Sequence, residues 1–196
     1  MPTRAETAAA TRLALLRSAS ELLDVGGPET VTLREVGARA GVSRSAPYRH
    51  FPDKDSLLTA LATQAWTEIG DSLQRLVERS DVPPREVLRR ALGTLTAVGR
   101  SRPHLYRLMF TTPATDPKAA VRAAGRAQDL FLEIVARLAG PATAPLYAGL
   151  LLTSAHGVTA LELSGHLTWD KWHASAEELL DLLVRLLPTE GTSPPP

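Results

Sequence analysis

The sequence contains no cysteine among its 196 residues. Disulfide bonds, thiolate nucleophiles and zinc-thiolate sites are therefore excluded. No stretch approaches the roughly 18 to 20 uninterrupted apolar residues of a membrane-spanning helix, and the N-terminus lacks the continuous apolar segment of a secretory signal. These absences predict a soluble protein with no membrane partner, which we expect in a reducing compartment, the cytoplasm.

Strand-like patterns are also missing, because no run of Val, Ile, Thr or aromatic residues alternates with polar residues. Ala, Leu, Arg and Glu dominate instead, at spacings typical of helices. The sequence therefore predicts an all-α fold of about nine helices. We expect these helices over residues 7–25, 32–40, 43–50, 54–79, 84–101, 104–110, 117–138, 144–166 and 175–187. A loop is expected around residues 169–172.

Motifs of common enzyme classes are absent as well. The sequence has no Gly-rich loop that would cradle phosphate, no Gly-x-Ser-x-Gly elbow and no His-Glu-x-x-His helix. His104, His156, His166 and His173 are spaced too widely to supply a pair of metal ligands on one helical turn. We therefore predict that the chain is not an enzyme and uses no metal or cofactor.

The net charge of +1 hides an uneven distribution of charged residues. Residues 34–54 carry five basic and two acidic side chains, residues 84–126 carry nine and two, and residues 127–196 carry three and eight. An acidic C-terminal part therefore masks two basic segments in the total. For residues 84–126, solvated helix faces, a site for an anionic ligand and a contact with flanking DNA are alternative interpretations.

The helices predicted over residues 32–40 and 43–50 meet at Gly41-Val42. A glycine can adopt the left-handed conformation that lets one helix end and another start sharply, so the arrangement predicts a helix-turn-helix. Thr32 and Glu35 have the spacing of a capping box, and Asp53 can cap the helix that follows.

The helix before this motif has an apolar stripe on which both short helices can pack. The expected members of this small core are Leu13, Leu16, Ala19, Leu22 and Leu23, opposed by Val36, Ala40, Val42 and Phe51. The other face of helix 43–50 is then left exposed.

The exposed face of helix 43–50 suits a DNA major groove. Arg44 can bind O6 and N7 of guanine, and Ser45 or the ring of Pro47 can contact bases or thymine methyl groups. Other residues of this motif have the reach to hold phosphates. The predicted DNA-contacting set is Thr32, Arg34, Ser43, Arg44, Ser45, Pro47, Tyr48, Arg49, His50 and Lys54.

Some members of this set have simpler interpretations. Arg49 could be ordinary solvated surface, and Thr32 could serve only as a helix cap. Pro47 is compatible with a helix because it lies within the first turn after Ser43, where at most one backbone hydrogen bond is lost.

Three segments of the chain, in this order, resemble the DNA-binding domain of TetR-family transcriptional regulators: Thr32–Val36, Gly41–Ser43 and Tyr48–Leu58. Pro47 departs from the pattern, because many members carry leucine or threonine there. The resemblance implies a helix-turn-helix domain over residues 1–56 and a helical ligand-binding and dimerisation domain over residues 57–188. Residues 189–196 are rich in Pro, Gly and Ser, and we expect a disordered tail there.

The resemblance further implies a homodimeric regulator of transcription that binds a palindromic double-stranded DNA operator and is released by a small molecule. A repressor is the first expectation, and an activator shares the same features. The last two long helices would pair across a twofold axis, which their helically spaced apolar residues permit. A helical scaffold or protein-binding module, in which the basic face would be incidental, is the alternative to a transcriptional regulator.

A small-molecule pocket with apolar walls and a few polar groups can be drawn from the C-terminal helices. Its expected lining is Tyr106, Met109, Phe110, Phe131, Thr153 and His156. Ordinary core is the alternative for each of these residues. His156-Gly157 and the segment 102–110 are also similar to a subgroup of the family that usually has a tryptophan one turn before the histidine, where this chain has Leu152.

Overall fold

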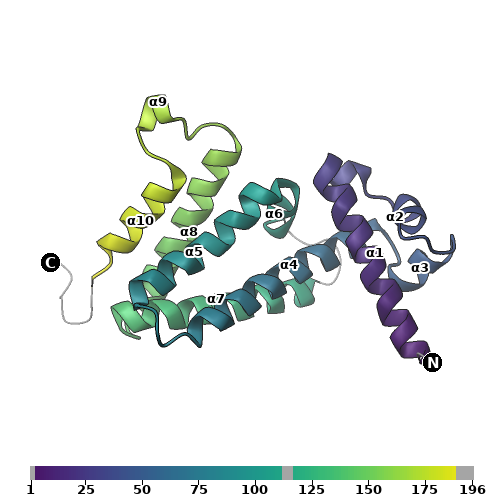
Figure 1. Ribbon diagram of the computed structural model, residues 1–196, viewed down its shortest axis with the longest axis horizontal. Helices are drawn as coiled ribbons and strands as arrows, with labels where there is room; N and C mark the ends of the chain where they lie inside the picture. The colour runs from purple at the N-terminus through teal and green to yellow at the C-terminus, as the bar shows by residue number, and fades with distance from the viewer. Residues whose placement is uncertain (1–2, 112–116, 189–196) are drawn as a thin grey trace. The chain divides into compact units, whose positions relative to one another are not determined.

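The computed structural model describes residues 3–111 and 117–188 of the chain. Within these residues the structure contains ten α-helices, one 3₁₀ turn and no strand (Figure 1). The predicted all-α fold is thereby confirmed. The predicted loop around residues 169–172 is wrong in detail, because Trp169–Trp172 forms a short helix. The predicted disordered tail, residues 189–196, lies outside the described residues.

The helices agree with the predicted ones in number and order apart from that short addition. They are α1 (Arg4–Gly26), α2 (Leu33–Arg39), α3 (Ala46–His50), α4 (Lys54–Val77), α5 (Pro84–Ser101), α6 (Pro103–Met109), α7 (Pro117–Ala139), α8 (Ala144–Leu163), α9 (Trp169–Trp172) and α10 (Ala176–Leu186), with the 3₁₀ turn η1 at Pro28–Thr30. Capping boxes start two of them, Thr3 with Glu6 at α1 and Ser175 with Glu178 at α10.

By packing, the described chain forms two compact units. The N-terminal unit comprises residues 3–66 with residues 102–111 and 117–123, and the C-terminal unit comprises residues 67–101 and 124–188. α6 therefore packs with the N-terminal helices, although it follows α5 in the sequence. The division into functional domains over residues 1–56 and 57–188 stays a prediction.

The core of the N-terminal unit is built on α1, which contacts α2, α3 and α6. Its buried apolar side chains include Leu15, Leu16, Ala19 and Leu23. Leu13, which was expected in this core, is 59% exposed, and the fully buried Leu15 takes the place. Two residues along a helix rotate a side chain by about 200°, so Leu13 and Leu15 face nearly opposite directions.

In the C-terminal unit, α5, α8 and α10 pack against one another. Figure 1 shows these three helices side by side, with α9 in the connection between α8 and α10. The second half of α4 lies along α7, where Arg126 pairs with Asp71 at 2.7 Å and Arg137 donates to the carbonyl of Val77 at 2.8 Å. α5, α7 and α10 each bury one apolar face, as their amphipathic sequences require. α8 differs, because it is apolar on its exposed face as well.

Most arginines of the basic segment 84–126 are held in ion pairs or hydrogen bonds within these units. Arg89 and Arg90 both bind Glu86 at 2.7 Å, and Arg100 binds Glu162 at 2.9 Å. Hydrogen bonds from Arg89, and then from Arg90, lower the pKa of Glu86 to about 2. This pairing favours the interpretation of the segment as helix surface.

Among the described residues, no single helix is long and apolar enough to cross a membrane, although α7 and α8 meet the criterion together as a pair bent by 116°. The same residues contain no group of three or more His, Asp or Glu side chains that could hold a metal ion.

Arg85 ties the end of the last helix to the start of α5. Its guanidinium donates to the carbonyls of Val184 at 2.5 Å and Leu187 at 2.9 Å. The carbonyls in the last turn of a helix have no partner within the helix, so Arg85 supplies what α10 lacks at its end. Arg85 therefore adds a polar link to the apolar packing of α10 on α5.

Replacing Arg85 with methionine keeps a long apolar stem and removes these donors. We expect the free energy of unfolding to fall by about 1 to 3 kcal/mol, because hydrogen bonds from a charged donor are lost at partly buried carbonyls. Urea denaturation followed by circular dichroism measures the change. Arg122→Met, at an exposed position of α7, is the control, and an equal loss in both variants would contradict the role of Arg85.

Candidate nucleic-acid interface

The turn between α2 and α3 is closed by glycine and by local backbone hydrogen bonds. Gly41 has a φ of +67°, the left-handed conformation expected of it. Its amide donates to the carbonyl of Ala38 at 3.2 Å, and the amide of Val42 donates to the carbonyl of Gly37 at 3.1 Å. The predicted helix-turn-helix therefore forms, with its turn at Gly41-Val42 as predicted.

α3 is shorter than the helix predicted over residues 43–50, because it begins at Ala46. Pro47 has no amide hydrogen, so the bond that would join it to the carbonyl of Ser43 in a longer helix cannot form. The amide of Ala46 donates to that carbonyl instead, at 3.0 Å, which makes a tight turn. Ser43, Arg44 and Ser45 therefore precede the helix.

The side chains around this turn form an exposed polar surface. Ser43, Arg44, Ser45 and Arg49 are exposed. Arg49 donates to the hydroxyl of Ser45 at 3.3 Å, and the hydroxyls of Ser43 and Ser45 lie 3.5 Å apart. Within the described chain, no side chain pairs with the Arg44 guanidinium. Arg44 is thus available to a partner, while Arg49 is oriented by its neighbour.

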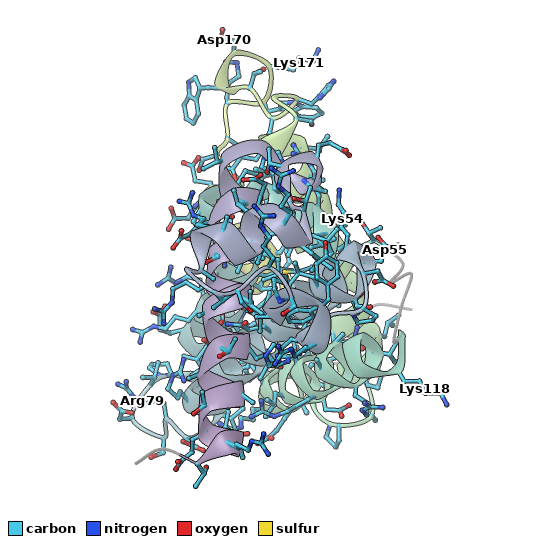
Figure 2. The ribbon with its side chains drawn as sticks, turned by 90° about the vertical axis from the view of Figure 1, so that its right-hand side faces the viewer. Lys54, Asp55, Arg79, Lys118, Asp170 and Lys171 are labelled. Carbon is cyan, nitrogen blue, oxygen red and sulfur yellow. The ribbon has the colours of Figure 1, made fainter. Side chains whose placement is uncertain are left out.

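Tyr48, His50 and Lys54 follow on α3 and at the start of α4. Tyr48 is 57% exposed, and His50 and Lys54 are half-buried. Figure 2 shows Lys54 beside Asp55 in the first turn of α4. One aromatic hydroxyl, one imidazole and one ammonium group therefore lie within seven residues, all of them able to donate to phosphate oxygens.

Asp53 caps α4, as its position predicts. Its carboxylate accepts a hydrogen bond from the amide of Ser56 at 2.7 Å. Hydrogen bonds from the Ser56 hydroxyl, and then from its amide, lower the pKa of Asp53. This contact fixes the first turn of α4, in which Lys54 lies.

Thr32 and Arg34 are both exposed at the start of α2. The hydroxyl of Thr32 accepts a hydrogen bond from the amide of Glu35 at 3.1 Å, which makes it the N-cap of α2. Capping does not bury the threonine, so its hydroxyl lies at the surface with Arg34.

Pro47 is the one member of the predicted DNA-contacting set that is buried. Its ring packs on Gly37 of α2. This position counts against the expected contact between the ring and a base. The sequence favoured that contact because residues 43–50 were placed on one helix, whereas the shorter α3 turns residue 47 toward α2.

One cation near this surface was not anticipated from the sequence. The guanidinium of Arg12, on α1, lies over the ring of Phe51 at 5.0 Å from its centroid. Phe51 directly follows α3 and is buried, so Arg12 covers the core beside the end of α3. A helical stripe containing Arg12 and Leu16 is the only signal for this contact in the sequence.

The six residues expected to line a small-molecule pocket are divided between the two units. Tyr106, Met109 and Phe110 lie on or just after α6 in the N-terminal unit, and the others lie in the C-terminal unit. Phe131 is buried, His156 is half-buried and Thr153 is exposed on α8. The structure thus brings three of the six together.

Trp66 of α4 joins Tyr106, Met109 and Phe110, although the sequence raised no expectation for it. Its indole donates to the carbonyl of Met109 at 3.3 Å, and its ring lies edge-on to Phe110 at 5.5 Å. Tyr106 and Phe110 are 5.0 Å apart between ring centroids. The aromatic cluster Trp66, Tyr106 and Phe110 therefore fastens α6 to α4, and Trp66 could have been noticed as a tryptophan on the apolar face of a long helix.

Two family descriptions match the chain. Residues 15–61 match bacterial regulatory proteins of the tetR family, and residues 88–187 match the tetracyclin repressor-like C-terminal domain. Among curated relatives, an HTH-type transcriptional repressor of Mycobacterium tuberculosis is 34% identical over 92 residues, which cover 47% of this chain and 44% of the relative. The chain therefore spans less than half the length of the curated relatives it matches.

Solved structures share the fold over most of the chain. A protein with unknown function from Rhodococcus sp. RHA1 is 28% identical, with a TM-score of 0.74 over 91% of this chain and 96% of that one. The structure of RolR with its ligand resorcinol is 22% identical, with a TM-score of 0.60 over 95% and 92% of the two chains. At that identity the second likeness concerns the fold alone.

Proposed function

Because the chain belongs to the TetR family of transcriptional regulators, we propose that it is a homodimeric repressor that a small molecule releases from a palindromic DNA operator. The observation that carries the proposal is the exposed polar surface of the turn and α3, from which Arg44 extends without a partner in the described chain. The curated relative from Mycobacterium tuberculosis is named a transcriptional repressor, which supports repression as the sign of regulation.

Base recognition falls to the residues at the turn. Arg44 is the principal reader, since a guanidinium matches O6 and N7 of guanine in the major groove. Ser45 lies next to it, and its hydroxyl also orients Arg49 at 3.3 Å. Pro47 has no contact with DNA in this proposal, because its ring is buried.

Residues that contact phosphates lie on both sides of these base-contacting residues. Tyr48, His50 and Lys54 hold the backbone from the end of α3 and the start of α4, and Thr32 and Arg34 hold it from the start of α2. Contacts of this kind fix the protein's position on the duplex but carry no sequence information. The DNA-contacting residues are therefore the predicted set without Pro47.

Dimerisation falls to α8 and α10. α8 exposes Leu146, Leu150 and Leu161, and Leu146 is 75% exposed. Added side chains would meet no atom within 4 Å at Gly149 and Gly157 of the same helix. On α10, Leu182 and Leu186 are exposed, the latter to 71%.

Exposure of such apolar stripes to water is energetically unfavourable unless another surface covers them. We assign a second copy of the chain as that surface, so that two α8 and α10 pairs form a four-helix bundle about a twofold axis. Each copy then places one α3 in the major groove of one half-site, with half-sites about 34 to 36 Å apart or a multiple of that distance.

The effector acts through α6, which carries Tyr106, Met109 and, just after it, Phe110. Arg102, before the first turn of α6, binds Asp24 of α1 at 3.0 Å and also donates to the hydroxyl of Ser20. The ring of His104 packs on Gly27, where a Cβ would lie 2.9 Å from Nδ1. A ligand that shifts α6 would therefore also move α1, the helix on which α2 and α3 pack.

The coupling between ligand and operator needs only a modest preference of the ligand for one position of α6. Allosteric couplings are typically about 1 to 3 kcal/mol, which changes operator affinity by roughly 5- to 150-fold. The complex of RolR with resorcinol supports a small molecule as the effector.

Arg44→Ala and Lys54→Ala separate base recognition from phosphate contact. We expect Arg44→Ala to cost about 1 to 3 kcal/mol on the best operator and to relax selection at one base position. Lys54→Ala should weaken binding to all sequences alike and reduce the slope of log affinity against log salt by about one. Selection from a random duplex pool and titrations at several salt concentrations measure both effects.

Arg75→Ala, which removes an exposed arginine in the second half of α4, is the control for these two variants. An unchanged consensus with Arg44→Ala would refute base reading by that residue, and a parental salt slope with Lys54→Ala would refute its phosphate contact. If the parental chain does not bind duplex DNA in a salt-dependent manner, the alternative of a helical scaffold with an incidental basic face is favoured instead.

Leu150→Glu tests the proposed dimer. A twofold axis places the new charge in the interface twice, and we expect a loss of about 3 kcal/mol, which is roughly a 100-fold higher dissociation constant. Analytical ultracentrifugation over a range of concentrations measures it. Val121→Glu, at an exposed valine of α7, is the control and should not change the mass distribution from that of the parental chain. A dimer that Leu150→Glu does not weaken would rule out the α8 and α10 face as the interface.

A double-mutant cycle with Arg102→Met and Asp24→Asn tests the link between α6 and α1. Both side chains are partly exposed, at 30% and 36%, so we expect a coupling energy of about 0.5 to 1 kcal/mol in urea denaturation. The single variants should also raise hydrogen exchange in α6. Additive effects of the two substitutions, with α6 exchange unchanged, would remove this link from the mechanism.

A further inference from the structure

Gly37 of α2 faces the ring of Pro47 of α3. A Cβ built on Gly37 would lie 2.7 Å from Cγ and 3.4 Å from Cδ of the Pro47 ring. Carbon atoms in van der Waals contact lie about 3.5 to 4.0 Å apart. Any other residue at position 37 would therefore overlap the ring.

The backbone gives no separate reason for a glycine at position 37. Gly37 lies in the middle of α2 and is absent from the residues with positive φ. Glycine is among the poorest helix formers, so its presence in a seven-residue helix needs another cause. The cause visible in the structure is the space that the Pro47 ring occupies.

A proline ring cannot rotate away from an intruding atom as a leucine side chain could. Its Cγ is bonded through Cδ to the backbone nitrogen, so a push on the ring is a push on the backbone of α3. α3 has only five residues, and Pro47 is the one that is buried. The contact with Gly37 therefore determines how close α3 lies to α2.

We propose that Gly37 and Pro47 are a matched pair of positioning residues that sets the distance of α3 from α2 and thereby the specificity of DNA recognition. This inference rests on the proposed binding of DNA through α3. The pair places Arg44, before α3, and Tyr48, on α3, relative to Thr32 and Arg34 at the start of α2. Binding groups must be held within about 0.5 Å of their productive positions. A Cβ at residue 37 would lie 2.7 Å from Cγ of Pro47, so reaching van der Waals separation needs a shift of about 0.8 to 1.3 Å, which exceeds that tolerance.

The pairing makes a prediction that simple loss of stability does not. Gly37→Ala should move α3 and lower affinity for the selected operator by about 10- to 100-fold, because base contacts depend on the position of the helix. Affinity for an unrelated duplex of equal length should change by less than about threefold, because phosphate contacts tolerate such shifts. Adding Pro47→Ala removes the ring and should restore at least about tenfold of the lost affinity.

The experiment uses the full chain and four variants: Gly37→Ala, Pro47→Ala, Gly37→Ala with Pro47→Ala, and Gly93→Ala. Gly93 is a helical glycine in α5 where an added Cβ would meet no atom within 4 Å, so it controls for the helix propensity of alanine. The operator is first selected from a random duplex pool with the parental chain. Fluorescence anisotropy then measures each variant on that operator and on the unrelated duplex, with circular dichroism as the measure of folding.

Recovery of operator affinity in the double variant, with the unrelated duplex unaffected, supports the pairing. If Gly37→Ala does not fold, recovery of the circular dichroism spectrum by the added Pro47→Ala supports it, and an unfolded double variant overturns it. Parental operator affinity in Gly37→Ala, equal losses on both duplexes, or a loss that Pro47→Ala does not relieve also overturns it. If the parental chain selects no sequence, the proposed DNA-binding function fails, and the role of the pair fails with it.

Discussion

A helix of five residues forms too few backbone hydrogen bonds to persist in water by itself. α3 therefore exists only because the rest of the N-terminal unit holds it. Pro47 sits on Gly37 of α2, and Phe51 is buried directly after α3 beneath the guanidinium of Arg12. Tyr48, Arg49 and His50 on α3 take their positions from this packing.

The same dependence connects α3 to helices far along the chain. α1 carries the core on which α2 and α3 pack, and α1 is also held by Arg102 and His104 of the α6 segment. Trp66 in turn joins α6 to α4, because its indole donates to the carbonyl of Met109. Lys54 lies at the start of the same helix, α4. A small molecule at α6 would thus act on two helices that position the DNA-binding groups, which is the physical basis of the proposed regulation.

The charged residues illustrate what a sequence can and cannot predict. The basic segment 84–126 was visible in the sequence, but its partners were not, because Arg100 pairs with a residue 62 positions away and Arg102 with one 78 positions away. Local spacing predicts only partners within a helical turn or so, such as Glu86 with Arg89 and Arg90. The distant pairs arise when folding brings separate helices together.

The long helices, the turn at Gly41 and the composition of the polar surface around Arg44 could be predicted from the sequence, since each follows from spacing within a few residues, whereas the start of α3 and the short α9 could not. The sequence also carried the family likeness. The tertiary structure alone decided which faces are buried: Leu15 in place of Leu13, Pro47 turned toward α2, and α6 packed with the N-terminal helices. The reason is physical, because periodicity fixes which side chains share a helix face, whereas the neighbouring helix decides which face meets water.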